Sequence, residues 1–202
     1  MGKRITIALM IAAGTVLIML MNLPAFRSPP KPAVTVTGQA AIGGPFTLED
    51  TKGNVITEKV LDGHYTLIYF GYTFCPDICP LALQYVTQSI QMAGPVADEV
   101  LPLFITIDPE RDTKDVIASY LGHFHPRMIG LTGTPEQIRA AESAYRVYAS
   151  KSPGSEGKTD YMMDHTGYIY LMNREGHYVA HFPKDATAQD IAARLRRELN
   201  PQ

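Results

Sequence analysis

The sequence predicts an α/β domain with a central mixed sheet flanked by helices. Residues 65–70 and 101–107 form apolar runs rich in β-branched and aromatic side chains, which are typical of buried strands. Helix-start signals follow them at Pro80, Asp112 and Thr134. Because strands alternate with helices, the inner strands are expected to run parallel, with helices on both faces of the sheet.

The first half of the domain opens with a hairpin signal. Apolar residues alternate over 46–56 around a Lys-Gly-Asn turn, and the first buried strand follows. Pro80 suits the first turn of a helix. The remaining elements expected here are helices at 80–93 and 113–124, the second capped by Asp112, and a short strand at 128–131.

The second half ends in two strands and a helix. A capping box with proline at the first helical position predicts a helix over 134–148. The stretch 151–160, rich in Ser and Gly, is expected to be a mobile loop. Strands at 167–173 and 177–182 and a helix over 187–199 then close the domain. By analogy, this ending resembles that of a thioredoxin-like fold.

The N-terminus predicts a transmembrane helix. Lys3 and Arg4 precede an uncharged, mostly apolar run over residues 5–23, and a spanning helix needs about 20 residues. A cleaved signal peptide is the alternative, but its apolar core is shorter, about 7–15 residues, and ends in a small-residue cleavage site. The segment after residue 22 is a poor cleavage site, so the sequence favours an uncleaved anchor.

These signals divide the chain into four parts. Residues 1–4 form a cytoplasmic N-terminus, 5–23 the anchor, 24–40 a Pro-rich linker and 41–202 the globular domain. Positive charges are balanced on the two sides of the anchor, so the free N-terminal amine favours a cytoplasmic N-terminus. We therefore expect a single-pass protein of the inner (cytoplasmic) membrane, with its domain on the periplasmic side.

The overall charge excludes one class of partner. The formal net charge is −2, with 18 Lys and Arg against 20 Asp and Glu. No basic field is present that would attract nucleic acid.

The chain has two cysteines, Cys75 and Cys79, placed between the first buried strand and its helix. A helix N-terminus lowers thiol pKa, so both are expected to be reactive. Redox thioredoxins use C-x-x-C, whereas three residues intervene here. On a helix this spacing places both sulfurs on one face, where they can close a disulfide or bind one metal ion.

A metal ion needs a third ligand, and His165 is one candidate. It follows the predicted mobile loop and precedes a core strand, whereas His123 and His125 lie near a helix end. Met162 and Met163 are soft potential donors beside it. Two thiolates and an imidazole suit Cu(I), Cu(II) or zinc, and an open three-ligand site suits a metal that is handed on.

Several segments of the chain together resemble the Sco/SenC family. The segments are 69–80 (YFGYTFCPDICP), 105–112 (ITIDPERD), 130–134, 145–148 and 164–166 (DHT). The resemblance spans about residues 42–199 and is highly specific.

The resemblance implies a thioredoxin fold and one copper ion, Cu(I) or Cu(II), per chain. By motif, Cys75, Cys79 and His165 correspond to the family's two thiolates and its histidine ligand. Family members help assemble the dinuclear copper centre of cytochrome c oxidase subunit II. The resemblance therefore implies that oxidase subunit as a partner and a second copper chaperone as a donor.

Two carboxylates are candidates for supporting roles. Asp108 lies at the end of a strand, near the same sheet edge, and could serve docking or site electrostatics or simply cap a loop. Asp164 could accept a hydrogen bond from His165 or form a local turn.

The competing hypothesis is a thiol–disulfide oxidoreductase that reduces the target's cysteines. It requires Cys75 and Cys79 but not His165. A thiol peroxidase is disfavoured because the Pro-x-x-x-Thr-x-x-Cys pattern is absent, with isoleucine at position 68. A docking module would need neither cysteine. The sequence leaves open whether the protein is an enzyme.

Overall fold

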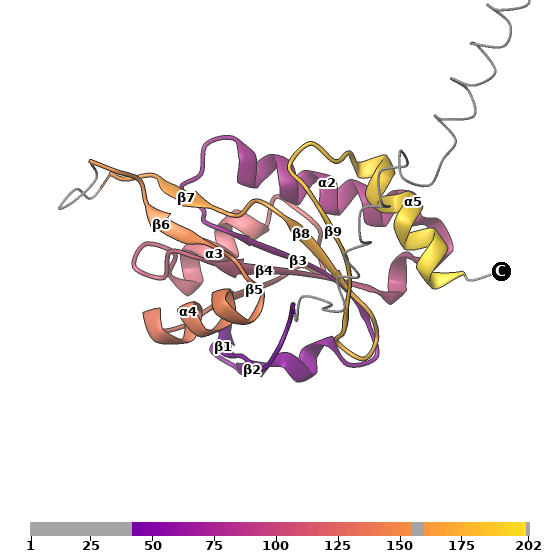
Figure 1. Ribbon diagram of the computed structural model, residues 1–202, viewed down its shortest axis with the longest axis horizontal. Helices are drawn as coiled ribbons and strands as arrows, with labels where there is room; N and C mark the ends of the chain where they lie inside the picture. The colour runs from indigo at the N-terminus through magenta and orange to yellow at the C-terminus, as the bar shows by residue number, and fades with distance from the viewer. Residues whose placement is uncertain (1–41, 155–159, 201–202) are drawn as a thin grey trace, which may run out of the picture. The chain divides into compact units, whose positions relative to one another are not determined.

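The computed structural model describes residues 42–154 and 160–200 (Figure 1). These residues form the expected α/β domain with a mixed central sheet. The strands are β1 (Thr47–Asp50), β2 (Val55–Thr57), β3 (Tyr65–Gly71), β4 (Val100–Thr106), β5 (Ile129–Thr132), β6 (Ala149–Lys151), β7 (Met163–His165), β8 (Ile169–Met172) and β9 (Tyr178–Phe182). The α-helices are α2 (Ile78–Ala93), α3 (Lys114–Leu121), α4 (Pro135–Ala144) and α5 (Ala188–Leu199), with 3₁₀ turns at Glu58–Leu61 and Gly94–Glu99.

The main sheet is seven-stranded, in the order β2-β1-β5-β4-β3-β8-β9. Strands β3, β4 and β5 are parallel neighbours, whereas β1 and β8 join them antiparallel. The predicted closing hairpin is confirmed as β8 and β9. The three central strands are buried because apolar residues occupy both of their faces.

Helices cover both faces of the sheet, as predicted. Tyr69 of β3 and Phe104 of β4 are cross-strand partners and share one face. On that face Tyr69 contacts Cys79 of α2, and Phe104 contacts Tyr120 of α3. Helix α5 packs against α2 (Figure 1). The opposite face holds Tyr145, which directly follows α4.

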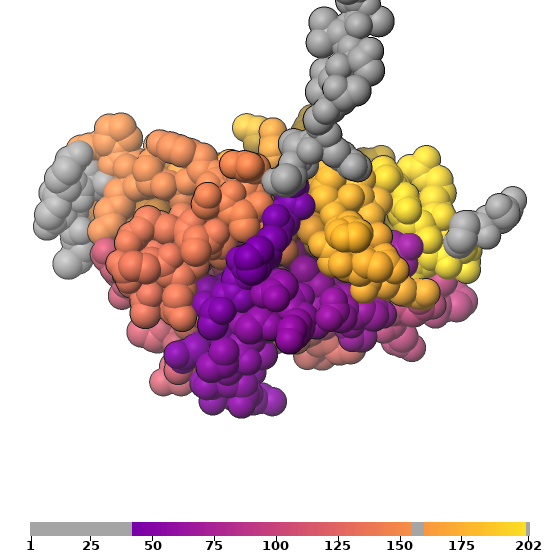
Figure 2. Space-filling model, turned by 60° about the horizontal axis from the view of Figure 1, so that its bottom comes forward, coloured from indigo at the N-terminus to yellow at the C-terminus, as the bar shows by residue number. Residues whose placement is uncertain are grey.

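The N-terminal hairpin is confirmed as β1 and β2. The Asp50 carboxylate accepts hydrogen bonds from the backbone of Lys52 and Asn54, which closes the turn. Upstream, the Gly43 N–H donates to the carbonyl of Ala144 at the end of α4. In Figure 2 the indigo residues cross the surface between the orange α4 region and the amber β8–β9 turn.

Helix α4 is shorter than predicted. Thr134 and Gln137 form the expected capping box, but the helix ends at Ala144 rather than near residue 148. Tyr145 is fully buried against Phe70, and Arg146 takes a left-handed conformation with φ of 57°. A left-handed residue cannot continue the helix, so the chain turns and becomes extended.

A second sheet was not predicted. Strands β6 and β7 form a two-stranded antiparallel hairpin at the ends of the predicted mobile loop. The loop itself is only partly covered, since residues 155–159 lie outside the described residues. Within this hairpin Ala149 of β6 pairs with His165 of β7, so the hairpin sets the position of the candidate ligand His165.

The predicted anchor at 5–23 and the predicted linker at 24–40 also lie outside the described residues. Among residues 42–154 and 160–200, no helix has the length and apolar character needed to span a membrane.

Candidate metal centre

Cys75 and Cys79 lie where the chain leaves β3 and enters α2. Cys79 is in the first turn of the helix and is fully buried, whereas Cys75 precedes the helix and is half-buried. The Cys79 N–H donates to the Cys75 sulfur at 3.4 Å, and both thiols are free. A side chain on Gly71 would start 2.6 Å from the Tyr69 ring and 3.1 Å from the Cys79 sulfur. Glycine therefore lets the helix bring that sulfur against β3.

The two thiols differ strongly in acidity. A hydrogen bond from Cys79, with further backbone donors at Asp77 and Ile78, lowers the pKa of Cys75 to about 5. The hydrogen bond between the two thiols and the burial of Cys79 together raise the pKa of Cys79. At neutral pH Cys75 is therefore a thiolate, while Cys79 keeps its proton until a metal or an oxidant removes it.

His165 reaches this pair from the end of β7. Its Nε2 lies 3.6 Å from the Cys79 sulfur, although 86 residues separate them. Its Nδ1 lies 3.1 Å from the carbonyl oxygen of Thr166. Because a carbonyl only accepts, Nδ1 carries the proton and the Nε2 lone pair faces the sulfur. Burial lowers the pKa of His165, which favours the neutral imidazole that metals bind.

Two tyrosines hold the imidazole in place. The rings of Tyr69 and Tyr72 meet the His165 ring edge-on, with centroids 6.2 and 5.9 Å away. Both tyrosines are fully buried. The orientation of His165 is thus fixed by β3, by the loop that follows β3, and by the carbonyl of Thr166.

The donor set fits a soft metal ion. Two sulfurs and one imidazole nitrogen converge on the N-terminal end of α2, at the carboxyl edge of the parallel strands. In the part of the chain that the structure describes, no three His, Cys, Asp or Glu side chains already stand close enough to hold an ion. Binding by all three residues would therefore bring their side chains closer together than they stand here.

The carboxylates of Asp108 and Asp164 form hydrogen bonds with residues other than Cys75, Cys79 and His165. Asp108 is 2% exposed and pairs with Arg111 at 2.5 Å, while the Tyr161 hydroxyl donates to it at 2.7 Å. The Asp164 carboxylate accepts from Ser152. The acceptor role considered for Asp164 beside His165 is taken by the Thr166 carbonyl. Asp108 instead belongs to a buried cluster that joins the loop after β4 to the start of the β7 segment.

Asp112 does not cap a helix, contrary to the sequence prediction. Thr113 caps α3, and the Asp112 side chain turns into the core, where it is fully buried. Its carboxylate accepts from the Thr73 N–H at 3.0 Å, the Thr73 hydroxyl at 2.5 Å and the Thr106 hydroxyl at 2.6 Å. Asp112 thereby ties the start of the cysteine loop to the end of β4.

Replacing Asp112 with asparagine is expected to destabilise the domain by about 3 kcal/mol, because an amide N–H₂ would face buried donors. Urea unfolding followed by circular dichroism measures this change. Asp115→Asn, at an exposed position in the first turn of α3, is the matched control and should cost well under 1 kcal/mol. Equal losses in the two variants would contradict the role assigned to Asp112.

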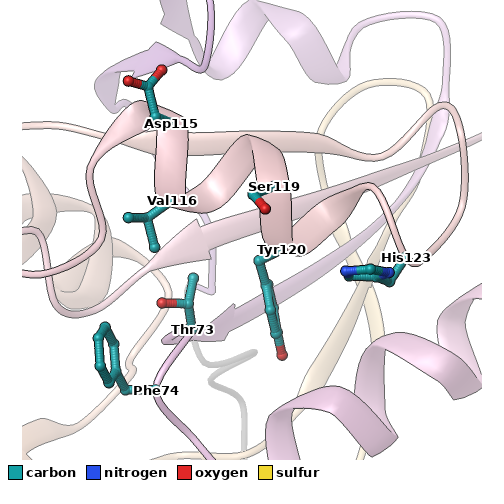
Figure 3. A pocket seen from close by; sticks show the side chains of 7 residues that line it. All are labelled: Thr73, Phe74, Asp115, Val116, Ser119, Tyr120 and His123. Atoms are coloured by element: carbon teal, nitrogen blue, oxygen red, sulfur yellow. The ribbon is translucent and has the colours of Figure 1, made fainter.

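His123 makes no contact with the cysteine sulfurs among the hydrogen bonds of the described residues. It lines a pocket of about 530 Å³ with Thr73, Phe74 and residues of α3. Figure 3 shows His123 at one end of this pocket and Phe74 at the other, with Tyr120 between His123 and Thr73. His125 is buried, and its Nδ1 accepts a hydrogen bond from the backbone N–H of Arg127.

The fold and the site together define a thioredoxin-like protein with two cysteines and a histidine at the carboxyl edge of its sheet. The SCO1/SenC family model matches residues 34–200. The chain therefore belongs to the SCO1/SenC family, as the sequence motifs predicted.

Known relatives support this assignment over nearly the whole chain. The chain is 38% identical to the SCO2-like protein of Rickettsia felis, over 95% of this chain and 94% of that protein. It is 40% identical to the human mitochondrial protein SCO1 homolog, over 81% of this chain and 55% of that protein.

Two solved structures of relatives contain copper. ScoI of Bradyrhizobium japonicum with copper bound is 47% identical, with a TM-score of 0.70, and the match covers 78% of this chain and 99% of that one. Yeast Sco1 with copper bound is 38% identical, with a TM-score of 0.74, and the match covers 80% of this chain and 90% of that one. These similarities confirm the predicted thioredoxin-like fold.

Proposed function

We propose that this protein is a copper metallochaperone that binds one copper ion through Cys75, Cys79 and His165. The observation that carries the proposal is the 3.6 Å approach of His165 Nε2 to the Cys79 sulfur, with the Cys75 sulfur accepting from the Cys79 N–H. The relatives solved with copper bound support copper as the metal. The family resemblance supports cytochrome c oxidase subunit II, with its dinuclear copper centre, as the recipient.

Copper is the cargo of this site, and the residues divide the work of holding it. Cys75 offers a preformed thiolate at the surface, where an incoming metal meets it first. Cys79 loses its proton when it binds the ion, and the buried Nε2 of His165 supplies a neutral donor. Since Cys75 is half-exposed, a thiolate of the recipient can approach the ion from that side.

The remaining proposals concern location and partners. Residues 5–23 anchor the chain in the inner membrane, and residues 24–40 link the anchor to the domain on the periplasmic side. A tethered carrier would meet a membrane-bound oxidase subunit at high local concentration. A second copper chaperone would serve as donor.

Transfer of copper to the oxidase subunit tests the function directly. The full chain, loaded anaerobically with Cu(I), is expected to hold one copper and to transfer it to the reduced, copper-free soluble domain of subunit II. Copper content after separation and the absorption of the dinuclear centre measure the transfer. A loaded chain that leaves the acceptor empty, while free Cu(I) fills it, would contradict the proposal.

A second function has a specific observation in its favour. A half-exposed thiolate at Cys75 beside the protonated Cys79 is the arrangement of a thiol–disulfide oxidoreductase. Cys75 would attack a target disulfide, Cys79 would lose its proton and resolve the mixed disulfide, and two electrons would pass to the target. The chain would finish as the Cys75–Cys79 disulfide, and the target would finish as one thiol, which holds the proton from Cys79, and one thiolate, which takes its proton from water.

A further inference from the structure

The sulfur of Met162 lies beside the candidate metal centre, on its solvent side. The Met162 side chain is 45% exposed, and its Sδ accepts from the Tyr72 hydroxyl at 3.9 Å. The next residue, Met163, donates its N–H to the same hydroxyl at 3.2 Å and packs its side chain against the core. Tyr72 therefore fixes the position of Met162 relative to the loop that carries Cys75.

Tyr72 also contacts the ligands proposed for copper. Burial raises the pKa of Tyr72, and the nearby charges of Cys75 and Cys79 add to this effect. The Tyr72 ring meets the His165 ring edge-on. Tyr72 thus contacts the Met162 sulfur through its hydroxyl and the His165 imidazole through its ring, so a single side chain links the thioether to a proposed copper ligand.

An exposed methionine alone would mean little, because single apolar side chains are common on protein surfaces. Met92 of α2 shows this, since it is 43% exposed and nothing suggests a role for its sulfur. Met162 differs because its sulfur contacts Tyr72, whose ring in turn contacts the proposed ligand His165. A thioether is a soft, neutral donor that prefers Cu(I) and binds more weakly than a thiolate.

We propose that Met162 is an additional Cu(I) ligand, which contacts the ion together with Cys75 on the side where copper enters and leaves. The inference rests on the proposed copper function and deepens it. With Met162 bound, the ion can release Cys79 or His165 during exchange and still keep three donors. A neutral ligand releases the ion readily, so it favours transfer rather than storage.

Binding of silver(I), a redox-inert substitute for Cu(I), to the reduced full chain tests this contact. With methyl-labelled methionine, nuclear magnetic resonance should show the Met162 methyl signal shifting as one silver ion binds, whereas that of Met92 stays in place. Silver should also slow oxidation of Met162 by hydrogen peroxide, relative to Met92. In a Cys75→Ser/Cys79→Ser variant, one equivalent of silver should no longer move the Met162 signal.

A kinetic test completes the design. Met162→Leu should still bind one Cu(I) but pass it to a chelating acceptor about tenfold more slowly. Met92→Leu, the control with matched exposure, should transfer at the wild-type rate. If one ion binds the cysteines while the Met162 signal and the transfer rate stay unchanged, the inference fails and the proposed function stands. If no ion binds the wild-type cysteines, the proposed function itself fails.

Discussion

Replacing Cys79 with serine is expected to weaken Cu(I) binding by about a thousandfold. Structural thiolate zinc sites gain ~10–16 kcal/mol from the whole donor set, so loss of one of three donors is worth about 4 kcal/mol. Serine keeps the size of the side chain but offers a hard oxygen that Cu(I) binds poorly. The Cys79 sulfur is fully buried beside His165, so no solvent-exposed donor can take its place. Competition with a chromogenic Cu(I) chelator measures the affinity.

The comparison with Cys75→Ser separates ligand loss from misfolding. Cys75 is half-buried, so its serine variant removes a donor with little disturbance of the core. Both serine variants should lose copper affinity, while only Cys79→Ser should also lose stability, through its contacts with Tyr69 and Gly71. Wild-type affinity in either variant would place the copper elsewhere.

Local signals predicted most of the fold. The strand at 65–70 is a run of apolar side chains buried on both faces, and the helices that begin after Thr134 and Thr187 carry complete capping boxes. These features depend on neighbouring residues alone. The predicted starts of these three elements therefore agree with the structure.

Non-local contacts explain what the sequence did not predict. Helix α4 ends early because Tyr145 packs against Phe70 of β3, a residue 75 positions away, and Arg146 then reverses the chain. The hairpin of β6 and β7 consists of two three-residue strands at either end of a polar stretch, which carry little periodic signal. The local sequence around Asp112 resembles a helix cap. Its actual partners, Thr73 and Thr106, lie on other elements, so the local sequence does not reveal them.

The same distinction holds for the site. The spacing of Cys75 and Cys79 is local, so both the disulfide and the metal alternatives could be read from the sequence. His165 was one histidine among six, and only the family resemblance identified it as a ligand. Its approach to Cys79 depends on the pairing of Ala149 with His165, which no local pattern reveals.

Replacing His165 with alanine is expected to separate the two proposed functions. Cu(I) affinity should fall about a hundredfold, because the neutral nitrogen contributes less than a thiolate but has no substitute nearby. Reduction of an oxidised subunit II peptide should stay within about twofold of the wild-type rate. Disulfide reduction needs the Cys75 thiolate and the Cys79 thiol. The hydrogen bonds that lower the pKa of Cys75 come from Cys79 and the start of α2, so they remain when His165 is removed.

Both activities are measured on the same preparation, so a folding defect would lower them together. His123→Ala removes an imidazole from the pocket of Figure 3 and none of the three proposed ligands, so it is the control and should change neither activity. If His165→Ala keeps full copper affinity, the cysteine pair binds copper without the histidine. If it instead loses peptide reduction, His165 takes part in proton transfer at Cys79, whose sulfur it faces at 3.6 Å, and the two functions share all three residues.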